Sequence, residues 1–328
     1  MDFIDLFCGG GFGARGAVSA GANPVLAVDC WRLATETYQH NFPNCNVETR
    51  LINARVPAKL RKSFRCELLI TSPECTSHSI ARGARPPDED SQETASHVIP
   101  WLKAFQPRWV ILENVKRMEL WDGHDDLLDK MAELKYSVSP LWLNSADFGV
   151  PQSRKRLFLL GDRAGTVTTR DDLLKLRVGG RKSVCAVLDP HRTHKTTPLY
   201  TPNRARATLD RAERAIAELG EGEPFLIVYY GSDYAGGWQS IRAPLRTITT
   251  LDRFALVTWD DGVPHMRMLQ PAELMRAMGG PDTPHELPFG TRRDKIKLCG
   301  NGVCSPVMEV LVKRIMQLNA TGAMKRAS

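Results

Sequence analysis

Short apolar runs alternate with polar and glycine-containing stretches along the first half of the chain. The runs predict buried strands at residues 2–7, 24–28, 68–70, 109–113, 136–143 and 156–160. Amphipathic segments between the runs predict helices, among them residues 32–41, 91–105 and 125–134. Because strands that alternate with helices form parallel sheets, we expect an α/β fold with a mostly parallel sheet.

The pattern changes after Gly161. Residues 165–245 contain few long apolar runs and many Thr, Arg, Pro and Gly, and one amphipathic helix at 205–219 interrupts them. A helix from Ser305 to about Asn319 then restores the earlier periodicity. We therefore predict a large domain made of residues 1–164 and 267–328, and a small domain at residues 165–266.

Charge is distributed unevenly between these two predicted domains. The chain of 328 residues has a formal net charge of +7 and a pI of about 9.0. Residues 165–214 hold eleven Lys and Arg against five Asp and Glu, so most of the excess lies in the small domain. A basic segment of this kind favours a polyanionic partner, and the alternative is a solvated basic face that binds nothing.

The eight cysteines contain no Cys-x-x-Cys pair, so the sequence predicts neither a zinc site nor any other metal site. No apolar run approaches the roughly 20 residues that a membrane-spanning helix needs. The first strand contains Asp2 and Asp5, which is unlike a signal peptide. These features indicate a reducing, intracellular location without a membrane.

A cysteine and a carboxylate follow two of the predicted strands. Cys75 comes shortly after the strand at 68–70, and Glu113 ends the strand at 109–113. Parallel strands bring their carboxyl ends to one edge of a sheet, where ligands and chemistry collect. A thiolate there can attack an electron-poor ring while a carboxyl group protonates that ring. Taken alone, Cys75 could equally be a half-buried cysteine that only packs.

A glycine-rich turn follows the first strand. Residues 11–16 match the pattern G-x-G-x-x-G, which is typical of both dinucleotide and S-adenosylmethionine folds. The next strand ends at Asp29, whose carboxylate could bind ribose hydroxyls.

Four motifs, in their order and spacing, resemble the cytosine-5 DNA methyltransferases. They are Asp5-Leu6-Phe7-Cys8-Gly9-Gly10-Gly11, Ser72-Pro73-Glu74-Cys75, Glu113-Asn114-Val115 and Gln152-Ser153-Arg154-Lys155-Arg156. The resemblance implies an S-adenosylmethionine methyltransferase sheet, in which Cys75 adds to carbon 6 of a flipped-out cytosine and Glu113 protonates ring nitrogen 3. It also implies that Arg154 and Arg156 meet the base and the target phosphates, while Lys155 points the other way.

The same resemblance assigns the cofactor site and the domains. The residues implied to bind S-adenosylmethionine are Phe7, Gly9, Gly11, Asp29, Cys30, Asn53, Ser72 and Asn301. Residues 1–164 and 267–328 become the catalytic, cofactor-binding domain, and residues 165–266 become the target-recognition domain. The segment from Ile80 to Asp90 resembles the loop that closes over DNA in this family.

This sequence departs from the family pattern at several positions. Cys30 stands where an aromatic residue is usual, and Asn53 replaces a carboxylate, so both changes bear on the affinity of the cofactor pocket. Glu74 stands where proline usually precedes the nucleophile. Since a carboxylate beside a thiol raises the thiol pKa, we expect Glu74 to point outward or to pair with an arginine.

The predicted function is therefore that of a DNA (cytosine-5) methyltransferase that acts on double-stranded DNA as a monomer in the cytoplasm. An RNA cytosine-5 methyltransferase on the same fold is one alternative. A catalytically silent nucleic-acid-binding relative is another, because of the substitutions at Cys30, Asn53, Glu74 and Thr76, which stands where the family usually has Gln. A nucleotide-dependent oxidoreductase leaves Cys75 and Glu113 unexplained.

Overall fold

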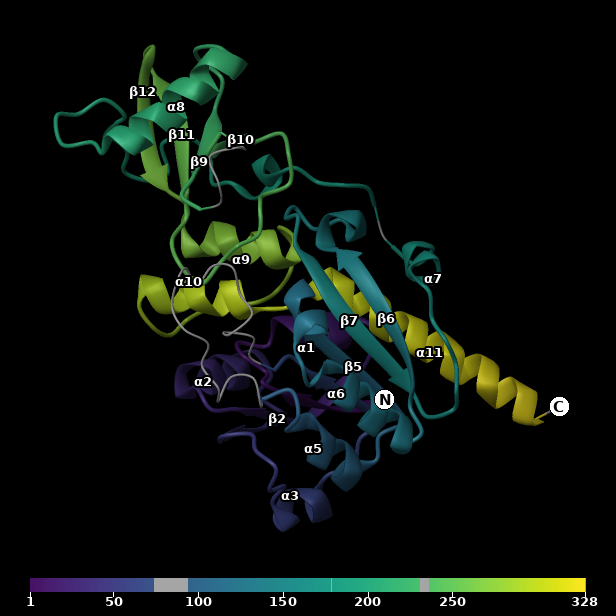
Figure 1. Ribbon diagram of the computed structural model, residues 1–328. Coiled ribbons are helices and arrows are strands. Elements are labelled where there is room, and N and C mark those ends of the chain that lie inside the picture. Colours follow the sequence, from purple (N-terminus) through teal and green to yellow (C-terminus); the bar gives the residue numbers. More distant parts are fainter. Residues whose placement is uncertain (74–93, 178, 231–235, 328) are drawn as a thin grey trace.

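The computed structural model describes residues 1–73, 94–177, 179–230 and 236–327, and contains two sheets (Figure 1). The first has seven strands in the order β3-β2-β1-β4-β5-β7-β6. Their bounds are β1 Asp2–Leu6, β2 Asn23–Asp29, β3 Asn46–Thr49, β4 Leu68–Thr71, β5 Trp109–Asn114, β6 Ser137–Asn144 and β7 Lys155–Asp162. The neighbouring strands from β3 to β5 are parallel, and β7 is antiparallel to both β5 and β6. The predicted mostly parallel sheet is confirmed.

Helices cover both faces of this sheet. They are α1 Phe12–Ser19, α2 Arg32–Asn41, α3 Ala58–Ser63, α5 Val98–Phe105, α6 His124–Glu133 and the long α11 Ser305–Ala327. Successive side chains of β4 enter different cores: Leu68 and Ile70 join the core with α1 and α11, and Leu69 joins the core with α5 and α6. Burial on both faces explains why the strands appear in the sequence as continuous apolar runs.

Helices α1 and α11 approach each other closely because of one glycine. A side-chain carbon at Gly16 would collide with the backbone carbonyl of Ser305. The Ser305 hydroxyl also donates a hydrogen bond of 2.8 Å to the carbonyl of Phe12. The last helix is thereby fixed against the first, beside the glycine-rich turn.

The second sheet is antiparallel and has the strand order β10-β9-β11-β12-β8. Its strands are β8 Thr197–Pro198, β9 Phe225–Val228, β10 Trp238–Ser240, β11 Phe254–Asp260 and β12 Val263–Met268, and helix α8 Arg206–Leu219 contacts β9 and β10. A small separate core forms between α8 and this sheet. In Figure 1 the second sheet lies at the opposite end of the molecule from α3.

Two connections join the sheets. The outgoing one contains α7 Arg170–Leu174 and η4 Val184–Val187, and the returning one contains α9 Pro271–Gly279 and α10 Arg292–Asn301. Helix α7 packs against α11 and β6, and Leu173 is buried in the core of the first sheet. The first part of the basic segment therefore lies beside the large sheet rather than in the small one.

Candidate functional site

The carboxyl ends of β4 and β5 meet at one edge of the first sheet. Thr71 lies opposite Leu112 in the parallel register, which brings Ser72 and Glu113 to the same edge. The side-chain amide of Asn114 donates a hydrogen bond of 3.4 Å to the Pro73 carbonyl and ties the two strand ends together. The predicted nucleophile Cys75 and its neighbour Glu74 lie outside the described residues, as does the predicted loop at 80–90.

Glu113 is a buried carboxyl group beside an arginine. It is 6% exposed, and its Oε1 lies 3.1 Å from Nε of Arg156. Burial raises the pKa of Glu113, while the charges of Arg156 and Arg154 oppose that rise. A raised pKa keeps a proton available nearer neutral pH, which suits a carboxyl group that must protonate a ring nitrogen.

Arg154 is buried and bonds to the protein backbone. Its Nη1 donates 3.0 Å to the Ile248 carbonyl and its Nη2 donates 2.8 Å to the Gly300 carbonyl. Its Nε has no hydrogen-bond partner among the described residues. Arg154 and Glu113 both line a small cavity. Arg154 thus joins the segment between β10 and β11, which contains Ile248, to helix α10, which contains Gly300. Lys155 is exposed between the two arginines, as the alternation of an extended chain predicts.

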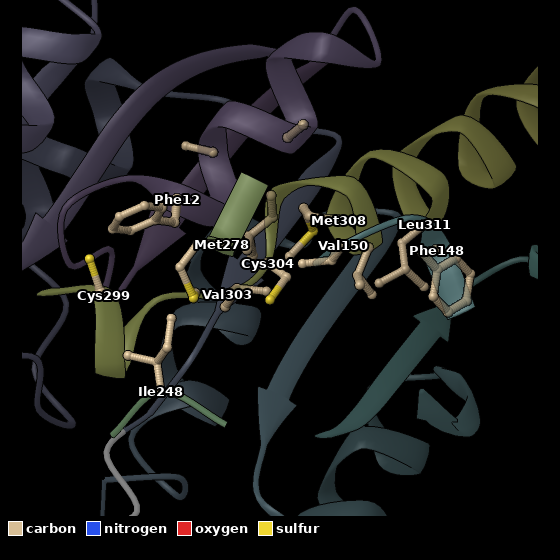
Figure 2. Packing of buried hydrophobic residues seen from close by; sticks show 14 of the residues in the cluster. Phe12, Phe148, Val150, Ile248, Met278, Cys299, Val303, Cys304, Met308 and Leu311 are labelled. Carbon is tan, nitrogen blue, oxygen red and sulfur yellow. The ribbon is translucent and has the colours of Figure 1, made fainter. Parts of the chain in front are cut away.

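Gln152 reinforces the same junction. It is fully buried, its Oε1 accepts a bond of 3.0 Å from the Ile248 amide, and its Nε2 donates 3.2 Å to the Ala277 carbonyl. Figure 2 shows the side chains of Ile248, Met278 and Cys304 gathered in this part of the core. The motif that contains Gln152 and Arg154 therefore connects three segments distant in sequence.

The glycine-rich turn and the end of β2 form a second cluster at this edge. The Gly9 amide donates 2.9 Å to Oδ2 of Asp29, and the Trp31 amide donates 2.8 Å to Oδ1. Burial raises the pKa of Asp29, and these two bonds and Lys297 oppose the rise. Phe7 has a φ of 54° and Gly9 a φ of 52°, so the chain turns sharply after β1. A side-chain carbon at Gly9 would meet nothing within 4 Å, which leaves space for a ligand against the backbone.

The other predicted cofactor residues are placed less uniformly. Ser72 is partly exposed, and Cys30, Asn53 and Asn301 are exposed. Oδ1 of Asn53 accepts a hydrogen bond of 2.9 Å from the Arg55 amide. At Gly11 a side-chain carbon would approach Phe42 to 2.7 Å, so this glycine also allows α1 and α2 to pack. The open backbone at Gly9 and the fixed Asp29 carboxylate fit a ligand that carries ribose hydroxyls.

Two residues near this cluster are not among the site residues predicted from the sequence. Trp31 presents an aromatic ring one position after Cys30, and Nζ of Lys297 lies 4.4 Å from the ring centroid. His285 packs on Phe12 with 4.3 Å between ring centroids, and burial lowers its pKa to about 3. The position of Trp31, two residues after Asp29, is a sequence signal that could have included it in the predicted cofactor site. His285 lies in the connection between α9 and α10, and the sequence pattern does not predict where that connection packs.

The family of the chain follows from comparison with known proteins. The family model for C-5 cytosine-specific DNA methylases matches residues 1–317. The chain belongs to this family. The predicted resemblance to cytosine-5 DNA methyltransferases is thereby confirmed.

Relatives of this cytosine-5 methylase include curated bacterial proteins. It is 34% identical over 227 residues to the Type II methyltransferase M.HgiDI of Herpetosiphon aurantiacus, a match that covers 68% of this chain and 70% of the relative. It is 32% identical over 168 residues to the Type II methyltransferase M.DdeI of Desulfomicrobium norvegicum, which covers 49% of this chain and 40% of that relative.

The fold of this methylase is also that of solved structures with little sequence identity. A Spodoptera frugiperda DNMT2 mutant superposes with a TM-score of 0.70 at 18% identity, over 95% of this chain and 98% of the other. The Dnmt2 methyltransferase of S. pombe gives a TM-score of 0.69 at 16% identity, over 97% and 98%. At such low identity these likenesses establish the fold alone.

Two kinds of feature are absent from the described residues. None of their helices is both long and apolar enough to cross a membrane. Within the same residues, no three His, Cys, Asp or Glu side chains are grouped as metal ligands would be.

Proposed function

We propose that this methylase transfers a methyl group to carbon 5 of a cytosine in double-stranded DNA through a covalent adduct with Cys75. The thiolate of Cys75 adds to carbon 6, while Glu113 holds and protonates ring nitrogen 3. The addition makes carbon 5 nucleophilic enough to accept a methyl group. Loss of the carbon-5 proton then expels the thiolate. The cytosine must leave the duplex, because carbon 6 cannot be reached in the stack.

The placement of Glu113 carries this proposal. Glu113 lies at the end of a central strand, is 6% exposed and is 3.1 Å from Arg156. Burying a carboxyl group costs free energy unless it is fully hydrogen-bonded, and buried groups of this kind are common at catalytic sites. Desolvation favours the protonated form of Glu113, and the two arginines keep the ionised form accessible. The same carboxyl group can therefore give a proton to nitrogen 3 and take it back.

S-adenosylmethionine is the proposed cofactor, and when bound it supplies the methyl group. Asp29, fixed by the amides of Gly9 and Trp31, would hold the ribose hydroxyls. Phe7 and the open backbone at Gly9 would line the pocket, and Gly11 would shape its floor. Ser72, Cys30, Asn53 and Asn301 complete the proposed set.

We assign target recognition to the second sheet and its flanking loops, within the predicted boundaries 165–266. The first part of that range, with α7, lies beside the large sheet. The names of the Type II relatives support a role in restriction-modification, in the bacterial cytoplasm. We take the active form to be a monomer.

A methyl-transfer assay tests the function. Radiolabelled S-adenosylmethionine is incubated with mixed-sequence duplex DNA, with transfer RNA and without substrate, and the products are digested to bases. Label in 5-methylcytosine from DNA is expected. Label only in transfer RNA would show that the substrate is RNA and not DNA. If the folded protein binds DNA but labels neither nucleic acid, it is a catalytically silent binding relative.

A further inference from the structure

The basic segment at residues 165–214 is less available to a partner than its sequence suggests. Arg170 and Arg181 both pair with Asp147, at 2.9 and 2.7 Å. Arg192 lies 3.1 Å from Asp260, and Arg206 lies 2.7 Å from Asp210. Several of the charges that make the segment basic are therefore balanced within the protein.

Three other cationic side chains lie at the edge of the first sheet where β4 and β5 end, and none of them has a carboxylate partner within the described ranges. Lys116 and Arg117 belong to η2 Lys116–Leu120, and Lys155 is the first residue of β7. All three side chains are exposed. Nζ of Lys116 lies 5.9 Å from the Trp142 ring centroid, a contact that leaves its charge open to another partner. We name these three residues the strand-end cation patch.

The patch lies next to Glu113. Lys116 is three positions after Glu113 in the chain, so their Cα atoms are at most about 11 Å apart. In the antiparallel register Asn114 lies opposite Leu157, which brings the start of β7 beside the start of η2, and η2 contacts β7. Lys155 also precedes Arg156, the residue 3.1 Å from the Glu113 carboxylate. The backbone of all three cations therefore lies at the strand ends that also carry Glu113, and the side chain of Lys155 points to the other face of β7 from that of Arg156.

We propose that the strand-end cation patch binds the DNA phosphates that flank the flipped cytosine. This inference rests on the proposed function. It assigns part of the DNA binding that does not depend on base sequence to the catalytic domain. Each cation that neutralises a phosphate releases condensed counterions, so binding becomes weaker as salt rises. Contacts with phosphates position the duplex and carry no base preference.

The test is the salt dependence of binding to a mixed-sequence duplex, followed by fluorescence anisotropy between 50 and 200 mM salt. The variant Lys116→Gln/Arg117→Gln/Lys155→Gln removes three charges. Its slope of log K against log salt should be shallower than that of the wild type by about 2.7. The ratio of wild-type affinity to variant affinity should then be about 40 times larger at 50 mM salt than at 200 mM salt.

A matched control removes three exposed charges from α3, at the far end of the molecule from the second sheet (Figure 1). The variant Lys59→Gln/Arg61→Gln/Lys62→Gln should keep the wild-type slope. A second patch variant, Lys116→Arg/Arg117→Lys/Lys155→Arg, keeps the charges and should also keep the slope, which separates lost charge from damaged packing.

A patch variant with the wild-type slope, or an α3 control with the same reduction, would overturn the proposal. So would a charge-preserving variant that loses the slope. The assay needs neither methyl transfer nor the recognised sequence. A protein that passes it but transfers no methyl group would keep the patch as a phosphate site and lose the proposed reaction.

Discussion

Replacing Arg154 separates two roles for the motif that contains it. The resemblance implies that Arg154 meets the base or its phosphates, whereas the structure directs its guanidinium to the carbonyls of Ile248 and Gly300, at 3.0 and 2.8 Å. Arg154→Met removes both donors and leaves two buried carbonyls without them. Arg154→Lys keeps the charge and can keep one bond.

The expected loss of stability follows from these two hydrogen bonds. A bond from a charged donor contributes about 1.5–3 kcal/mol, and a buried acceptor left alone costs about 1–3 kcal/mol. Arg154→Met should therefore lower the free energy of unfolding by about 3–5 kcal/mol, and Arg154→Lys by about half of that. At about 2 °C per kcal/mol for a protein of this size, the melting temperature should fall by about 6–10 °C in the methionine variant.

Thermal unfolding at one fixed scan rate is the assay, because a chain with two sheets need not unfold in a single step. The matched control is Lys155→Met, an exposed neighbour, which should change the melting temperature by no more than about 1 °C. If Arg154→Met melts within about 1 °C of the wild type and loses mainly DNA affinity, Arg154 is a nucleic-acid contact and the structural reasoning is wrong.

Three further predictions concern turnover, packing and pH. Glu113→Gln keeps the shape of the carboxyl group but cannot transfer its proton, so methyl transfer at saturating DNA should fall by about 10²–10⁴; a variant within tenfold of the wild type would remove Glu113 from the chemistry. Gly16→Ala should cost at least about 1–3 kcal/mol in thermal unfolding, because the added carbon meets the backbone of α11. Gly13→Ala, where that carbon has ordinary contacts from 3.5 Å, should be neutral or stabilising; equal losses would refute the packing argument. Finally, the pKa of His285 is about 3 in the folded state and about 6.5 when unfolded. The unfolded chain therefore binds the extra proton below pH 6.5, and stability falls as the pH drops. By pH 5 the wild type should have lost about 2 kcal/mol relative to His285→Phe, read from unfolding at pH 7.5 and 5, and parallel pH profiles would contradict this assignment.

The first sheet could be predicted because its strands are buried on both faces. Continuous apolar runs marked β4 and β5, and their polar ends marked the positions of Ser72 and Glu113. The rule that parallel strands end at one edge then predicts that Cys75 and Glu113 lie at that edge. Glu113 does lie there, and Cys75 is outside the described residues. The predicted sheet type and the family are confirmed.

The partners of charged side chains could not be predicted in the same way. Local sequence gives the charge of Arg170 and Arg181, but not that both reach Asp147 from another part of the chain. Likewise, an alternating pattern predicts that Arg154 and Arg156 point away from Lys155, but not that one binds backbone carbonyls and the other a carboxylate. Such pairings depend on tertiary packing.

The most direct test of the central claim is covalent trapping of the protein on DNA. Mixed-sequence duplex containing 5-fluorocytosine is incubated with S-adenosylmethionine and either the wild type or Cys75→Ser, and the products are separated under denaturing conditions. Fluorine blocks the loss of the carbon-5 substituent, so the wild type should remain attached to the DNA, and peptide mass spectrometry should place the adduct on Cys75. A Cys75→Ser protein that still forms the adduct, or an adduct on another residue, would contradict the proposed mechanism.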